Sequence, residues 1–96
     1  MKLFNFNLDK VNLNDDIITT YKNKTLILKE IKLYDGPVTM QYLPYGGIQS
    51  VYNYNLIINS KEGFITCAYV IYDNVIMSNK EFIKTYNDLV NTILPN

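Results

Sequence analysis

Residues 64–94 constrain the fold of this chain more than any other stretch. Residues 64–72 (FITCAYVIY) are rich in β-branched and aromatic residues, and Lys61-Glu62-Gly63 and Asp73-Asn74 bound them with turn chemistry. Neither set of alternating positions is polar. We therefore expect a strand in the middle of a sheet, covered on both sides, followed by a short return strand at residues 75–77.

A helix is predicted over residues 79–94. Ser78 has the chemistry of an N-cap, and Glu81 three residues later completes a capping box. Met77 and Phe82 occupy the two positions of a hydrophobic staple. Pro95 is expected to end the element. The apolar positions form one stripe with the helical period: Phe82, Ile83, Tyr86, Leu89, Val90 and Ile93.

The rest of the chain predicts strands joined by polar turns. The segment 25–34 changes the parity of its apolar residues, from Leu26 and Leu28 to Ile31 and Leu33, which predicts a β-bulge near Lys29-Glu30. A helix is the competing interpretation of this segment. The remaining predicted strands are residues 2–8, 17–21, 38–43 and 48–58.

These elements predict the α+β class, with residues 1–96 forming a small single domain. We expect a twisted, mostly antiparallel sheet of about five to seven strands, packed by the C-terminal helix. One helix covers only one face of a sheet. The second face must then be closed by sheet curvature, by the N-terminal strands or by another chain, so a homodimer is one hypothesis.

Composition excludes several function classes. Nine lysines balance nine acidic residues, and the chain has no arginine and no histidine. The balance disfavours non-specific nucleic-acid binding, and the missing histidine excludes His-based catalytic triads and His metal sites. No apolar run approaches the length of a membrane span, and the N-terminus lacks a secretion signal, so we expect a cytoplasmic protein.

Few residues suggest chemistry. Cys67, the single cysteine, is expected to be buried and inert, and a lone thiol agrees with a reducing compartment. Asp15, Asp16 and Asp35 leave open a metal-dependent enzyme, although turns explain these acids equally well. No nucleotide or calcium motif is present. We therefore predict a protein without catalytic residues, metal or cofactor.

Tyrosine is the enrichment that suggests function, with nine residues in 96. Tyrosine supplies rigid contact area with a polar end, and glycine and asparagine adapt around it, as in many recognition surfaces. High β-propensity and an AT-rich genome would also explain the enrichment. The predicted partner-binding residues are Tyr42, Tyr45, Gly46, Gly47, Tyr52 and Tyr54.

Two functions follow as hypotheses. The first is a non-catalytic protein-binding module, an accessory protein of a virus or mobile element that inhibits a host defence enzyme by occluding it. The second is a homo-oligomer that binds or sequesters a small ligand such as a nucleotide, using tyrosine stacking and the backbone amides of Gly46 and Gly47.

Overall fold

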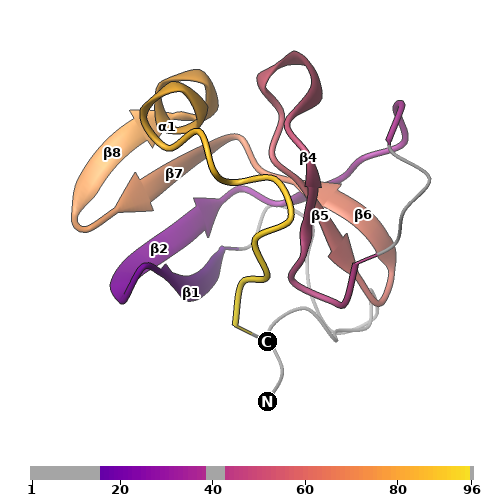
Figure 1. The fold of residues 1–96 in the computed structure, drawn as a ribbon, viewed down its shortest axis with the longest axis horizontal. Helices are drawn as coiled ribbons and strands as arrows, with labels where there is room; N and C mark the ends of the chain where they lie inside the picture. The colour runs from indigo at the N-terminus through magenta and orange to yellow at the C-terminus, as the bar shows by residue number, and fades with distance from the viewer. Residues whose placement is uncertain (1–15, 39–42, 96) are drawn as a thin grey trace.

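The described part of the chain folds into two four-stranded antiparallel sheets and one short helix (Figure 1). The structure, a computed structural model, describes residues 16–38 and 43–95. Sheet A has the order β1-β2-β7-β8, and its strands are β1 (Ile17–Tyr21), β2 (Lys24–Lys29), β7 (Tyr69–Tyr72) and β8 (Val75–Ser78). Sheet B has the order β3-β6-β5-β4, and its strands are β3 (Lys32–Leu33), β6 (Gly63–Thr66), β5 (Ile57–Ser60) and β4 (Ile48–Ser50). The α+β class and the antiparallel pairing are confirmed, but one sheet becomes two.

The predicted central strand is a bent ribbon. Strand β2 pairs with β7, and β3 pairs with β6, so two continuous segments run antiparallel from sheet A into sheet B. Two residues on each segment lie between the two ladders, Glu30-Ile31 on one and Cys67-Ala68 on the other. Strands that pass from one sheet into another form such corners at bulges or bends.

The bend explains the apolar character of both faces of residues 64–72. The buried apolar residues are Ile65 and Cys67 before it and Val70 and Tyr72 after it, so their parity changes at Ala68, although Thr66 is buried as well. The prediction of one continuous strand was therefore wrong, but both halves are central strands as expected: β7 lies between β2 and β8, and β6 lies between β3 and β5. The bulge predicted at Lys29-Glu30 lies at the matching break, where Glu30 has a φ of 56°.

The helix is much shorter than predicted. Helix α1 spans Asn79–Thr85 and ends at Tyr86, whose φ of −118° and ψ of 88° are not helical. Its start is as expected, because the backbone N–H of Glu81 donates to Ser78 Oγ over 3.1 Å. The apolar stripe continues only through turns: Leu89 is buried, but Ile93 is 46% exposed. The asparagine and aspartate residues of this segment favour turns over helix, and Asn91 has a φ of 73°.

The predicted strand 48–58 is a hairpin. Strands β4 and β5 pair antiparallel, and the 3-10 turn η1 (Tyr52–Tyr54) follows β4. Asn53 and Tyr54 both have left-handed backbone angles, which reverse the chain. The turn at Asp73-Asn74 is confirmed, and a polar turn at Lys22-Asn23 joins β1 to β2. Both residues of each turn have a positive φ, as in type I′ hairpins.

Two other predicted strands fall wholly or mainly outside the described residues. Residues 2–8 lie outside them, and so do residues 39–42 of the segment 38–43. Val38 and Leu43, which flank that gap, belong to no strand.

The C-terminal segment joins the two sheets (Figure 1). Ile48 N–H donates to the carbonyl of Thr92, and Leu94 N–H donates to the carbonyl of Gly46, each over 2.8 Å. Thr19 Oγ1, on edge strand β1, donates to the carbonyl of Pro95 over 3.2 Å. Residues 91–95 therefore connect edge strand β4 of sheet B with edge strand β1 of sheet A.

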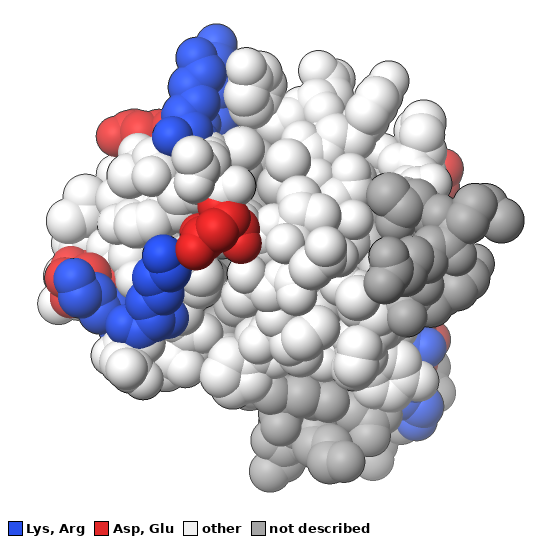
Figure 2. All heavy atoms as spheres, viewed as in Figure 1, with Lys and Arg blue, Asp and Glu red and all other residues white. Residues whose placement is uncertain are grey.

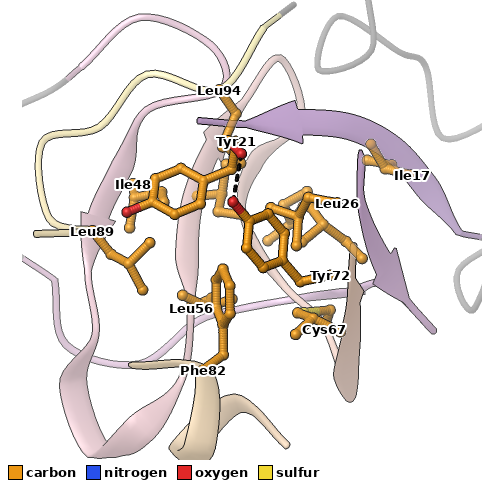
Figure 3. Close-up of a cluster of buried hydrophobic side chains, with 14 of the residues drawn as sticks. Ile17, Tyr21, Leu26, Ile48, Leu56, Cys67, Tyr72, Phe82, Leu89 and Leu94 are labelled. Atoms are coloured by element: carbon orange, nitrogen blue, oxygen red, sulfur yellow. Dashed lines mark hydrogen bonds between the residues drawn. The ribbon is translucent and has the colours of Figure 1, made fainter. Parts of the chain in front are cut away.

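One hydrophobic core draws on both sheets, the helix and the C-terminal segment (Figure 3). Leu26 and Val70 come from sheet A, Ile48 from sheet B and Phe82 from α1, and Leu94 comes from the C-terminal segment. Each of these five residues is at most 1% exposed. The bend closes the second face of the ribbon only in part. Ile65 and Cys67 are buried in this core, whereas Ile71 lies on the outer face of sheet A beside the exposed Ile76, so the homodimer hypothesis stays open there.

Candidate functional site

The described tyrosines of the predicted site lie at opposite ends of β4. Tyr45 precedes the strand and lies beside the C-terminal segment, while Tyr52 and Tyr54 follow it in η1, next to α1. Tyr42 lies outside the described residues. The sequence therefore suggested one recognition loop where the structure has two separate surfaces.

Gly46 and Gly47 have structural roles. Gly46 N–H donates to the carbonyl of Asn59 and Gly47 N–H to that of Pro44, over 2.8 Å and 2.9 Å. Gly46 has a φ of 93°, and a Cβ at Gly47 would overlap the Cβ of Leu43. Both glycines are buried. Their amides are already bonded within the chain, which argues against a ligand site built from them.

The η1 turn holds Asn53 and Tyr54 in a strained backbone conformation. Asn53 and Tyr54 have φ of 53° and 60°. The left-handed region costs an L-residue about 1–2 kcal/mol, and a bulky side chain there is unusual. Tyr52 and Tyr54 are nevertheless 56% and 44% exposed, so burial of their rings does not explain the conformation. Six other described non-glycine residues also have a positive φ, but Tyr54 is the one aromatic residue among them, and strain at such a residue is a reason to test it for function.

Two lysines of α1 pack on the Tyr54 ring. Lys80 Nζ lies 5.3 Å and Lys84 Nζ 5.8 Å from the ring centroid, within the range of cation–π interactions. Among residues 16–38 and 43–95, neither lysine lies within ion-pair distance of a carboxylate. We call Tyr52, Tyr54, Lys80 and Lys84 the η1 surface. It offers two aromatic rings and two positive charges to a partner.

No sequence signal identifies the two lysines as part of a site. Lys80 and Lys84 lie off the apolar stripe of the predicted helix, a position that is typical of solvent-facing residues. Their position beside Tyr54 depends on the packing of α1 against η1, which connects residues 26 and 30 positions apart in the sequence.

Three other tyrosines belong to the fold. The rings of Tyr21, Tyr72, Tyr86 and Phe82 are all in mutual contact, with centroid separations from 5.2 Å to 5.9 Å. Tyr72 also donates its hydroxyl to the backbone carbonyl of Tyr21 over 2.7 Å (Figure 3). This aromatic cluster fixes β1, β7 and α1 together. Part of the tyrosine enrichment is therefore structural.

An apolar groove lies at the other end of β4. Its volume is about 550 Å³, and its walls are Leu43, Pro44, Tyr45, Ile93, Leu94 and Pro95. None of these side chains is charged. In Figure 2 most charged side chains lie on the left side and at the edges of this face, and one acidic side chain beside a basic one lies near its middle. The groove is large enough for a small ligand.

The titratable groups with shifted pKa values are explained by the fold. Tyr21 donates its hydroxyl to Asp88 over 2.5 Å, and this bond, together with the Lys22 ion pair at 2.9 Å, lowers the pKa of Asp88. Burial raises the pKa of Tyr21 to about 12. A hydrogen bond from Lys29 lowers the pKa of Asp16, whose carboxylate also accepts from the backbone of Glu30.

Cys67 is buried, as expected. Burial raises its pKa to about 12, so the thiol is protonated at neutral pH. Asn79 donates its side-chain N–H to the carbonyl of Cys67 over 2.8 Å and so joins the start of α1 to the bend of the ribbon. A protonated, enclosed thiol is a poor nucleophile.

Within the described ranges, no three His, Cys, Asp or Glu side chains gather closely enough to hold a metal ion. Asp16 is paired with Lys29, Asp35 is exposed in a loop, and Asp15 lies outside those ranges. The same part of the chain has no helix long and apolar enough to cross a membrane.

Comparison with protein-family models, with curated proteins and with solved structures gives no significant match to this chain. Function is therefore argued from the geometry of the candidate surfaces.

Proposed function

We propose that this protein is a non-catalytic binding module that covers part of a partner protein with its η1 surface. The observation that carries the proposal is the strained, exposed display of Tyr54 between Lys80 and Lys84. Exposed tyrosines are typical anchors of protein interfaces, because they bury much area with little loss of side-chain entropy.

The two lysines define the chemistry of the partner. Lys80 and Lys84 are free of carboxylates within the described residues, so an acidic surface would gain two charge pairs without breaking existing ones. We therefore propose a partner with carboxylates around an apolar or aromatic pocket. In its specific form, we propose that the chain is an accessory protein of a virus or mobile element and inhibits a host defence enzyme. The support for this form is the composition of the sequence: it is rich in tyrosine, balanced in charge and typical of an AT-rich genome.

An affinity capture from the native host tests the proposal. The bait is compared as wild type, as the double variant Tyr52→Ala/Tyr54→Ala and as Tyr45→Ala, a matched control because Tyr45 is 39% exposed at the other end of β4. We expect the wild type and the control to retain one protein that the double variant loses. Retention by all three baits would refute the role of the η1 surface.

Salt and charge provide a second measurement on the captured partner. The variant Lys80→Glu/Lys84→Glu should weaken binding, and the wild-type affinity should fall as ionic strength rises. If neither the charge-reversal variant nor higher ionic strength changes the affinity, the proposal of an acidic partner is contradicted.

A small-ligand protein remains the second candidate, and the groove beside Tyr45 favours it. The described residues of its walls include no cation, so the geometry suits an apolar or aromatic ligand better than a phosphate group. Native mass spectrometry of protein purified from its own host decides between the two. A small molecule lost in Tyr45→Ala would support the groove, and a mass equal to that of the bare chain would count against it.

A further inference from the structure

The outer face of sheet A carries a row of isoleucines that crosses all four strands. The ladder registers place Ile18 opposite Ile27, Ile27 opposite Ile71, and Ile71 opposite Ile76. Ile18 is 59% exposed and Ile76 is 70% exposed, while the two central residues are half-buried. The four side chains share one face because directly paired residues point to the same side of a sheet.

The row plays no part in the core. The alternate residues of the same strands, such as Leu26, Leu28 and Val70, point to the inner face and are buried. The helix also lies on that inner side, because Phe82 of α1 packs against the inward-pointing ring of Tyr72. An aligned apolar row on a solvent-facing sheet contributes little to the fold of one chain and is typical of an interaction surface.

The residues that flank the isoleucine row on the outer face are polar, and the charged ones among those described form ion pairs. Asp16 and Lys29 form an ion pair of 2.6 Å on one side, and Lys24 and Asp73 form one of 3.7 Å on the other. The residues next to the row on its two sides are otherwise uncharged: Thr20, Thr25, Tyr69, Asn74 and Ser78. An apolar centre with a polar rim is the usual anatomy of an interface.

We propose that this face binds a second copy of the chain, with the isoleucine rows of the two copies packed against each other. Among the residues that the structure describes, the charges of the rim are already paired, so this part of the face has no net charge with which to select a charged partner. For the same reason, two identical faces meet without like-charge repulsion. A twofold contact uses the same patch on both copies, and a straight apolar row across four strands is complementary to itself.

The outer face of sheet A is small for a protein interface. Four strands are about 19 Å wide, and five residues of a strand are about 17 Å long, which gives a flat area of about 320 Å². A standard interface covers about 800 Å² of each partner, so a dimer on this smaller face is expected to be weak, and we take a Kd on the order of 100 μM as the value to bracket.

Sedimentation velocity over about 5–500 μM tests the proposal, because this range brackets the expected Kd. The wild type should change from monomer to dimer across the range. Ile76→Lys, in the centre of β8, should stay monomeric at every concentration. Val75→Lys is the matched control: Val75 is the next residue, is 52% exposed and points to the opposite side of β8. This control should dimerise like the wild type.

Circular dichroism and thermal melting confirm that the variants are folded, and Ile18→Lys at the other end of the row replaces Ile76→Lys if the latter unfolds. A wild type that is monomeric throughout the range would overturn the proposal. So would an Ile76→Lys variant that dimerises normally. A monomeric chain in which Ile76→Lys instead abolishes capture of a different protein would also overturn it, because the occupant would then be a heterologous partner.

Discussion

Replacing Phe82 with alanine tests whether the aromatic cluster fixes α1, and with it Lys80 and Lys84, against the rest of the domain. Phe82 is fully buried, and its ring contacts Tyr21, Tyr72 and Tyr86 at centroid distances of 5.9 Å, 5.5 Å and 5.2 Å. Truncating a buried phenylalanine costs about 3–5 kcal/mol. The three ring contacts place the expected loss in the upper half of that range, since each aromatic pair adds about 0.5–1.5 kcal/mol beyond burial.

The loss is large relative to the whole domain. At about 0.05–0.15 kcal/mol per residue, 96 residues give about 5–14 kcal/mol of stability. The melting temperature should fall by at least about 16 °C, since 1 kcal/mol corresponds to about 4–8 °C for a domain of this size.

Urea unfolding, followed by far-UV circular dichroism and by tyrosine fluorescence, measures the free energy of unfolding. Val90→Ala, at a 43% exposed apolar residue in the same C-terminal region, is the control and should change it by at most about 0.5 kcal/mol. A loss below about 1.5 kcal/mol for Phe82→Ala, or one equal to that of the control, would refute the assignment of the cluster as the anchor of α1.

Two further predictions concern Asp88, which bonds to Tyr21, and Gly47, which packs against Leu43. Asp88→Asn should flatten the loss of stability in acid: the folded-state pKa of Asp88 lies below its ordinary value of 3.8, so its contribution is complete above that value and disappears as pH falls through the lower one. Melting curves from neutral pH to below pH 3.8 check this, and parallel profiles for the two proteins would contradict it. Gly47→Ala should destabilise the domain by about 1–3 kcal/mol, because the new Cβ would overlap Leu43 and approach the carbonyl oxygen of Pro44 to 2.9 Å. Urea unfolding checks it, and wild-type stability would show that Gly47 is not packed as described.

The sequence predicted the elements better than their arrangement. The parity change between Leu28 and Ile31 located one half of the bend between the sheets. The partner segment gave no such signal, because residues 64–72 are apolar at both parities and look the same whether the strand is flat and covered or bent between two sheets.

The start of the helix was predictable and its end was not. The cap at Ser78 is a local hydrogen bond, and local chemistry is visible in the sequence. The end at Tyr86 depends on tertiary contacts: Asp88 bonds to Tyr21, and residues 91–94 pair with β4. These contacts outweigh an apolar period that would otherwise continue the helix.

The candidate surfaces were only partly visible in the sequence. Tyr52 and Tyr54 were identified from composition, but the same argument applied to tyrosines that the structure places in the core, such as Tyr21 and Tyr72. The isoleucine row could not be predicted from the sequence. Its four members come from four strands and are aligned only by the strand registers.

The central claim is that Tyr54 serves recognition while the buried tyrosines serve the fold. Isothermal titration of the captured partner against wild type and Tyr54→Ala, beside the melting curves of both proteins, tests it most directly. The account predicts that Tyr54→Ala weakens binding at least about tenfold, as expected for an interface anchor, and leaves the melting temperature within a few degrees of the wild type. An unchanged affinity in a folded Tyr54→Ala protein would contradict the claim.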